Sequence, residues 1–347
     1  MTALDPTLES VERVLHDTGR TVRRAMLDAI PDGEPHDWLY GPVRDYPLRA
    51  GKAIRPALCI AACCSFGGRE SDALPLAVSI ELLHNAFLIH DDIADGSEQR
   101  RGKPTLPETS GLAIALNAGD ALAVVSNQVL RRHLRNLDRD LAERVHTEFD
   151  TMAMRTLEGQ ATELGWRRDR TADLTPEDYL NLIMHKTCWY TTIHPLRVGA
   201  LIGARGRVDL RPMVRFGFHL GAAFQIQDDV LNLIGDEEEY GKEINGDLFE
   251  GKRTLPLIHL MSHAEGTDRA VVSSYLAMSR AERSPETVTE IRSLMEAYQS
   301  IEFTLDYAQG IASEAIDAFE TAFAEAEPGA DRDFVRDLIP YMLSRRS

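Results

Sequence analysis

The chain has 347 residues, of which 44% are hydrophobic and 27% charged, so it is long enough to bury a sizeable core. Its formal net charge of −17 argues against nucleic-acid binding, because an acidic protein repels phosphate backbones. No apolar stretch runs for about 18 residues without a charge, which argues against a membrane span. The first residues, MTALDPTLES, lack the basic start and apolar core of a secretion signal, so we expect a cytoplasmic protein.

The predicted elements are helices separated by short segments rich in proline and glycine. An amphipathic helix begins near Leu8 and ends at PDGEP; Arg55-Pro56 opens a second helix, which FGGRE ends. A third helix runs to Asp95 and leads into the loop SEQRRGKPTLPETSG. Further helices are predicted over 112–135, 139–162, 176–203, 208–235, 253–264, 268–279, 285–325 and 331–344.

Strands have little support, because aromatic residues make up only 7% of the chain and alternating β-branched runs are nearly absent. The predicted fold class is therefore all-α. No break in composition and no low-complexity linker divides the sequence, so we predict one domain over residues 1–347.

Two aspartate pairs, Asp91-Asp92 and Asp228-Asp229, each follow an apolar helical stretch and lead into a basic segment. In DDIAD, Asp91 and Asp95 are one helical turn apart and share a face, whereas Asp92 points about 100° away. Such carboxylates can share Mg²⁺, which prefers oxygen ligands and substrate phosphate. A solvated helix end would explain one pair, but not two pairs with the same flanks. The pattern indicates a site that binds diphosphate through metal ions.

With these motifs, the chain resembles the trans-isoprenyl diphosphate synthases of the polyprenyl synthetase family, most clearly over residues 45–262. The family has DDxxD followed by RRG, then FQxxDDxxD followed by GK and GKxTLP. The matching residues are Asp91, Asp92, Asp95, Arg100, Arg101 and Gly102 for the first motif, and Phe224, Gln225, Asp228, Asp229, Asn232, Gly241, Lys242, Gly251 and Lys252 for the second. The resemblance implies an antiparallel helical bundle of the isoprenoid synthase type around a central cavity.

The resemblance also implies how two diphosphate substrates are bound. Isopentenyl diphosphate would be held by four residues that match the family's GGKRxRP segment, a histidine before the first motif and the second arginine of RRG: Lys52, Arg55, His84 and Arg101. The allylic diphosphate and its surroundings would be contacted by Arg100, Lys186, Thr187, Gln225 and Lys242. Asp229 and Lys252 belong to the predicted substrate-binding set as well.

In such an enzyme, three Mg²⁺ ions would neutralise the allylic diphosphate as it leaves. The resemblance places two ions on Asp91 and Asp95 and one on Asp228. The predicted catalytic residues are Asp91, Asp92, Asp95, Lys186, Asp228 and Lys242. Isopentenyl diphosphate would then attack the allylic cation, and the departing diphosphate would accept the proton, since no side chain is an obvious base.

Three positions depart from the family pattern. Ala53 replaces a usual arginine, which weakens the positive field around isopentenyl diphosphate. Asn232 stands where the second motif often has its last aspartate, and an amide oxygen is a poorer magnesium ligand, so we expect a supporting role for it. Pro107 occupies a position that is often histidine, and nothing in the sequence explains it.

Product length is expected to depend on the helix that carries DDIAD. In the family, the fourth and fifth residues before the first aspartate form the floor of the product cavity; these are Phe87 and Ala86. Two aromatic residues there generally imply a fifteen-carbon product, whereas one small residue opens further depth. We therefore predict geranylgeranyl diphosphate, with farnesyl diphosphate as the alternative. The alternative interpretation of Phe87 is an ordinary core residue on a buried helix.

Two other functions remain open. A class I terpene cyclase shares the fold and DDxxD, but its second metal motif needs a Ser or Thr and then a Glu where this chain has Asn232 and Asp236. A non-catalytic partner subunit would usually lack motif aspartates that are present here. The expected partners are small isoprenyl diphosphates and, from the resemblance, a second copy of the chain in a homodimer.

Overall fold

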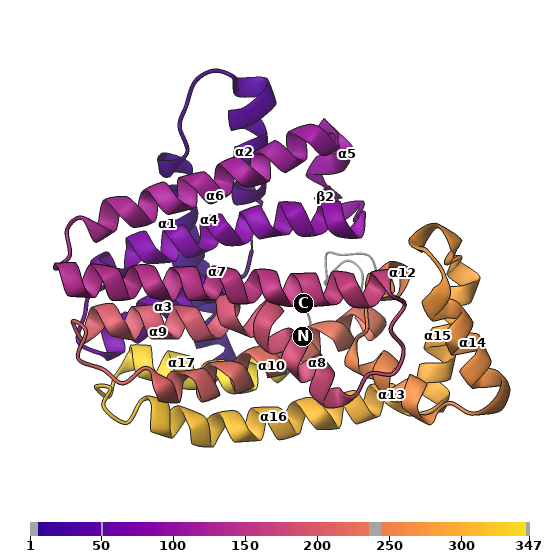
Figure 1. Cartoon of the computed structure of the whole chain (residues 1–347). Helices are drawn as coiled ribbons and strands as arrows, with labels where there is room; N and C mark the ends of the chain where they lie inside the picture. Colours follow the sequence, from indigo (N-terminus) through magenta and orange to yellow (C-terminus); the bar gives the residue numbers. More distant parts are fainter. Residues whose placement is uncertain (1–5, 50, 236–243, 345–347) are drawn as a thin grey trace.

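The computed structural model describes residues 6–49, 51–235 and 244–344, and the described chain is a bundle of helices (Figure 1). In the first half, the helices are α1 (Pro6–Ala29), η1 (His36–Tyr40), α2 (Gly41–Leu48), α3 (Ile54–Ser65), α4 (Glu70–Asp95), α5 (Leu106–Ser110), α6 (Leu112–Leu134) and α7 (Arg139–Arg168). The strands found in the described ranges are β1 (Gln99–Arg100) and β2 (Lys103–Pro104), a short antiparallel hairpin after α4. The predicted all-α class is confirmed.

The second half of the described chain continues the bundle. Its helices are α8 (Pro176–Ile183), η2 (Met184–Ile193), α9 (His194–Gly203), α10 (Arg211–Ile234), α12 (Gly246–Glu250), α13 (Leu255–His263), α14 (Gly266–Ala277), η3 (Arg280–Glu282), α15 (Pro285–Ala297), α16 (Ser300–Ala322) and α17 (Ala330–Ser344). Close pairs include α4 with α6, α10 with α16 and α3 with α9. In Figure 1 the α14 and α15 pair extends from one end of the bundle.

A large apolar core fixes the helices that carry both aspartate motifs. It includes buried residues of α4 and α10, among them Ile89 and Ala223, with many others from α1, α3, α6 and α9. Helix α4 ends immediately after the first motif because Gly96 adopts a left-handed conformation (φ 64°) that glycine tolerates best. The first motif is therefore the last turn of a helix whose body is anchored in the core.

The helices differ from the sequence predictions at several places. The helix predicted over 139–162 runs on to Arg168, and the loop predicted after Asp95 contains the hairpin and α5. The single helix predicted over 285–325 is two helices, because Gln299 adopts a left-handed conformation (φ 55°) between α15 and α16. The helix predicted over 176–203 contains a π-helical stretch, η2, between α8 and α9. Between PDGEP and Arg55, where no helix is predicted, the structure contains η1 and α2.

Two described helices are long and apolar enough to cross a membrane by length and composition. In α4, 67% of the most apolar window is buried inside the protein, as in the core helix of a globular bundle. In α6 the corresponding fraction is 39%, because several of its apolar side chains face outward. These properties are weak evidence for a membrane span, and its predicted absence stays a prediction.

Candidate active site

A cavity of about 700 Å³ lies between the two aspartate motifs, a size typical of pockets for small-molecule ligands. It is lined by most of the residues predicted from the sequence: Lys52, Arg55, His84, Asp91, Arg100, Arg101, Lys186, Thr187, Gln225, Asp228, Asp229 and Lys252. Lys242 falls outside the described residues. The structure therefore brings residues from α4, η2, α10 and the loops near them to one cavity.

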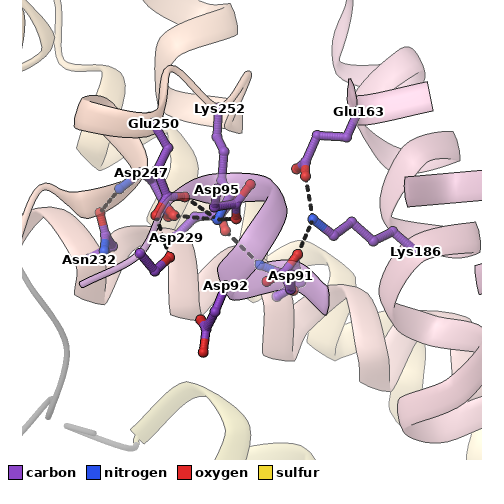
Figure 2. A network of polar contacts seen from close by, with 12 residues as sticks. Asp91, Asp92, Asp95, Glu163, Lys186, Asp229, Asn232, Asp247, Glu250 and Lys252 are labelled. Carbon is purple, nitrogen blue, oxygen red and sulfur yellow. Dashed lines mark hydrogen bonds and ion pairs between the residues drawn. The ribbon is translucent and has the colours of Figure 1, made fainter. Parts of the chain in front are cut away.

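Asp91 faces Lys186, which is also paired with Glu163 from another helix (Figure 2). Lys186 Nζ lies 3.5 Å from Asp91 Oδ1 and forms a very close ion pair with Glu163 of α7. Burial alone would lower the pKa of Lys186, but the carboxylates of Asp91 and Glu163 raise it above its ordinary value. Gln160, one turn before Glu163, donates to Asp91 Oδ1 over 3.4 Å. Lys186 is therefore a fixed positive charge beside the first aspartate.

Asp95 belongs to a second charge cluster, centred on Lys252. The Lys252 ammonium lies 3.1 Å from Asp95 Oδ2, 3.3 Å from Asp247 Oδ1 and 2.6 Å from Glu250 Oε2 (Figure 2). Burial would raise the pKa of Asp95, but Lys252, Lys186 and Arg167 together hold it below its ordinary value. The clustered carboxylates are thus balanced by the protein's own cations.

Asp92 points away from both lysines, as its position on the helix predicts (Figure 2). Its side chain is fully buried, with Arg100 bound to Oδ1 and the Tyr46 hydroxyl donating to Oδ2. Arg49, held over the Tyr46 ring, donates to the carbonyls of Arg100 and Pro104 at 3.0 and 2.7 Å. This geometry suits a role in fixing Arg100 and the β1–β2 hairpin rather than direct contact with a substrate.

Residues of the second motif, on α10, form a hydrogen-bonded chain with Thr187 and Tyr179. Gln225 accepts from the Thr187 hydroxyl at 2.9 Å and donates to Asp229 at 2.7 Å, and the Tyr179 hydroxyl donates to Asp229 at 2.7 Å. Burial, followed by the charge of Asp247, raises the pKa of Asp229 to about 8 despite these hydrogen bonds. Both aspartates line the cavity, but Asp228 is less buried than Asp229, so a ligand in the cavity has more access to Asp228.

Asn232 ties the second motif to the loop that follows it. Its side-chain oxygen accepts from the Asp247 backbone N–H at 3.1 Å, and its carbonyl accepts from the Asn245 N–H at 2.7 Å. Asn232 is buried and holds α12 in place, so that Asp247 and Glu250 lie beside Lys252. The Asn232 amide thus supports the α12 segment through hydrogen bonds, a role that does not require it to bind a metal.

The basic residues predicted for isopentenyl diphosphate line the cavity from α3, α4, the hairpin and the loop before α3. Arg101 adopts a left-handed conformation (φ 55°) and donates to the Arg49 carbonyl at 2.9 Å. Burial lowers the pKa of Arg101 to about 10, and Glu81 opposes that shift. Arg55 donates to the Thr191 hydroxyl at 2.9 Å. The arginines are thus held by the protein in a partly desolvated place.

The two predicted chain-length residues occupy different surroundings. Ala86 is fully buried in the main core, whereas Phe87 is half-buried and its ring meets the Tyr190 ring edge-on at 6.0 Å. Among the described residues, the cavity wall includes Tyr190 and Leu88 but neither Phe87 nor Ala86. Phe87 therefore contacts a cavity-wall residue, Tyr190, without being part of the described wall, and Ala86 is packed in the core.

Several site residues could not be identified from the motifs. They are Tyr46, Arg49, Gln160, Glu163, Arg167, Asp247 and Glu250. One signal was available: Gly159 lies within a helix, where glycine often marks close packing. A Cβ at Gly159 would lie 2.2 Å from the Lys186 backbone nitrogen, so this glycine allows α7 to approach η2 and brings Glu163 to Lys186.

The donor set suits magnesium. The side chains of Asp91 and Asp228 offer carboxylate oxygens, the ligand type that Mg²⁺ prefers, and both line the cavity. Asp95, the third predicted ligand, is buried, is not among the described lining residues, and is paired with Lys252 and Arg167. Across the ranges that the structure describes, no three acidic, histidine or cysteine residues converge closely enough to hold a metal alone. Mg²⁺ ordinarily takes only one or two carboxylates with water and phosphate, so this arrangement fits an ion shared with a diphosphate.

Comparison with known proteins places this geometry in a family. The polyprenyl synthetase model matches residues 36–295. The chain is 32% identical over 280 residues to a geranylgeranyl diphosphate synthase of Sulfolobus acidocaldarius, covering 80% of this chain and 83% of that protein. It is 30% identical over 301 residues to a (2E,6E)-farnesyl diphosphate synthase of Mycobacterium bovis, covering 86% and 80%.

A solved structure agrees with these relatives. The crystal structure of a polyprenyl synthase from Caulobacter crescentus, complexed with calcium and isoprenyl diphosphate, superposes with a TM-score of 0.85 at 25% identity and covers 98% of each chain. The predicted resemblance and the enzyme class that goes with it, trans-prenyltransferase, are confirmed. The chain belongs to the polyprenyl synthetase family.

Proposed function

We propose that this protein is a short-chain isoprenyl diphosphate synthase that joins isopentenyl diphosphate to an allylic diphosphate. The observation that carries the proposal is that one cavity is lined by both predicted sets of charged residues. Asp91, Lys186 and Asp228 line it between α4 and α10, and Arg55 and Arg101 line it near α3. Two diphosphates can therefore bind in the same cavity.

The allylic diphosphate would bind between the aspartate motifs. Mg²⁺ held by Asp91, Asp95 and Asp228 would supply the positive charge that makes diphosphate a leaving group; we propose three ions. Lys186 is already fixed beside Asp91, and Arg100 is fixed by Asp92, so both present positive charge where negative charge develops. These cations need little rearrangement during the reaction.

The second substrate would bind at the second set of basic residues. Lys52, Arg55, His84 and Arg101 would hold isopentenyl diphosphate so that its double bond points toward the allylic carbon. Orienting two reactants in this way can itself supply a large part of the rate enhancement. The departing diphosphate is the proposed proton acceptor, because the carboxylates described around Lys252 and Lys186 are already engaged by cations.

We infer geranylgeranyl diphosphate as the main product. Phe87 is the single aromatic residue of the predicted pair, and the small side chain of Ala86 adds no bulk behind it. Farnesyl diphosphate is the alternative, since the relatives include synthases of both kinds. Purified protein should be incubated with Mg²⁺, isopentenyl diphosphate and primers of five, ten or fifteen carbons, and the products sized by mass. A twenty-carbon diphosphate is expected from every primer; a hydrocarbon or alcohol would instead indicate a terpene cyclase.

We also infer a cytoplasmic homodimer. Neighbouring helices α6 and α7 expose large apolar side chains: Leu112, Leu116, Val124, Met154, Leu157 and Leu164. Such a surface is typical of a contact between copies. The four cysteines are free, as is usual in a reducing compartment. Light scattering should give twice the chain mass, and Leu116→Glu with Leu157→Glu should give the monomer; a wild-type monomer would contradict the inference.

A further inference from the structure

We propose that Tyr190 is a positioning and specificity-determining residue that contacts both the isopentenyl diphosphate site and Phe87, the predicted chain-length residue. The proposal rests on the function proposed above. Tyr190 lies on η2, four residues after Lys186, and its half-buried side chain forms part of the cavity wall. None of the family motifs quoted above includes it.

Tyr190 contacts the predicted isopentenyl diphosphate site through Arg55. The Arg55 guanidinium carbon lies 4.3 Å from the centre of the Tyr190 ring, and the next residue, Thr191, accepts a hydrogen bond from the same guanidinium at 2.9 Å. Thr191 is fully buried, so it is a fixed point. Two consecutive residues of η2 therefore set both the position and the plane of the guanidinium.

The same ring contacts two residues of α4. Its centroid lies 5.7 Å from that of His84 and 6.0 Å from that of Phe87, the latter at an interplanar angle of 88°. His84 and Phe87 are three residues apart and so lie on one face of the helix. Edge-to-face packing of this kind is a favourable aromatic geometry. Tyr190 thus supports a predicted substrate-binding residue and the predicted chain-length residue at once.

The backbone that carries Tyr190 is held on two sides. Gly159 of α7 allows close approach to Lys186 at the start of η2. Gly221 of α10 does the same further along, because a Cβ there would lie 2.5 Å from the Thr192 hydroxyl oxygen. π-Helical turns inside longer helices often occur at functional sites. With η2 packed against both α7 and α10, the Tyr190 ring is a rigid support for its neighbours.

Loss of this ring should therefore have two separate effects. Arg55 would lose its cation–π contact in a partly desolvated place, so isopentenyl diphosphate should bind roughly 2- to 30-fold more weakly. Phe87 would lose its edge-to-face partner and turn more freely, which would deepen the cavity and lengthen the product. A residue that only fills space would produce neither effect selectively.

The test compares Tyr190→Leu, which removes the ring, with Tyr190→Phe, which keeps it. We expect the leucine variant to raise the KM for isopentenyl diphosphate about 2- to 30-fold, to change the KM for the allylic primer less than about twofold, and to shift products toward longer chains. Tyr190→Phe should behave as wild type. Tyr307→Leu is the matched control, because Tyr307 lies on α16, which supplies none of the described residues lining the cavity.

Several results would overturn the proposal. A folded leucine variant with wild-type KM values and products would refute it, as would an equal rise in both KM values accompanied by a lower melting temperature. Tyr190→Met is the second variant if leucine prevents folding, and failure of both to fold would show a purely structural role. A wild-type protein that forms no prenyl diphosphate would refute the proposed function itself, whereas an active wild type with unaffected variants would refute only the role of Tyr190.

Discussion

Asp92 provides a sharp test of which carboxylates support the structure and which perform chemistry. Its side chain is 0% exposed, and Arg100 binds it through Nε at 2.9 Å and through a closer Nη2 contact. Asp92→Asn would keep the shape but leave a buried guanidinium without its main counter-ion. Breaking a buried pair in this way costs about 3–5 kcal/mol. Asp91 Oδ2, 3.8 Å from Arg100 Nη2, would remain as a second counter-ion. We therefore expect the free energy of unfolding to fall by an amount near the lower limit of that range.

The matched control is Asp91→Asn, the same chemical change one residue earlier. Asp91 is 23% exposed, and its loss leaves Lys186 paired with Glu163, so we expect the free energy of unfolding to fall by less than about 1 kcal/mol. Catalytic turnover should nevertheless fall about 100-fold or more in this control. Both variants should be unfolded in urea without metal and then assayed with Mg²⁺. Equal stability of Asp92→Asn and wild type would refute the structural role of Asp92.

The remaining predictions concern packing, titration and product length. Gly159→Ala should lower the free energy of thermal unfolding by about 1–3 kcal/mol and should also lower the catalytic activity, because its Cβ would lie 2.2 Å from the Lys186 backbone nitrogen. Gly165→Ala, with nothing within 4 Å, should be neutral or stabilising, and equal behaviour of the two would contradict this reasoning. Because the pKa of Asp229 rises on folding from 3.8 to about 8, its carboxyl keeps a proton that the unfolded chain releases. The free energy of unfolding of the metal-free protein, measured by urea titration, should therefore fall between pH 4 and 8. Asp229→Asn should lessen that fall. If the variant leaves the slope of the unfolding free energy against pH unchanged, the raised pKa of Asp229 is contradicted. Phe87→Ala should lengthen the product by at least one five-carbon unit on mass analysis, and unchanged products would make Phe87 a core residue only.

The sequence was most informative where chemistry depends on local spacing. Helical geometry placed Asp91 and Asp95 apart from Asp92, and the structure shows Asp92 turned toward Arg100. Arg55, Lys186 and Asp228, which the resemblance brought together as site residues, line one cavity. These results follow because a helix converts sequence spacing directly into direction.

Contacts between distant segments could not be predicted in the same way. Arg167 meets Asp95 from 72 positions along the chain, and Glu163 reaches Lys186 only because α7 packs closely on η2. The break at Gln299 was missed because the helical pattern of 285–325 continues across it. Phe87 and Ala86 were predicted to form the cavity floor, but neither is among the described lining residues, because α4 buries Ala86 in the core and Phe87 packs against Tyr190. In each case tertiary packing, not local pattern, decided the outcome.

The most direct test of the account is the release of diphosphate by purified protein supplied with isopentenyl diphosphate, an allylic diphosphate and Mg²⁺. We expect one diphosphate released for each isopentenyl diphosphate consumed, no release when either substrate or the metal is omitted, and loss of turnover in Asp91→Ala. Full turnover in Asp91→Ala, or release without isopentenyl diphosphate, would contradict the assignment of this cavity to chain elongation.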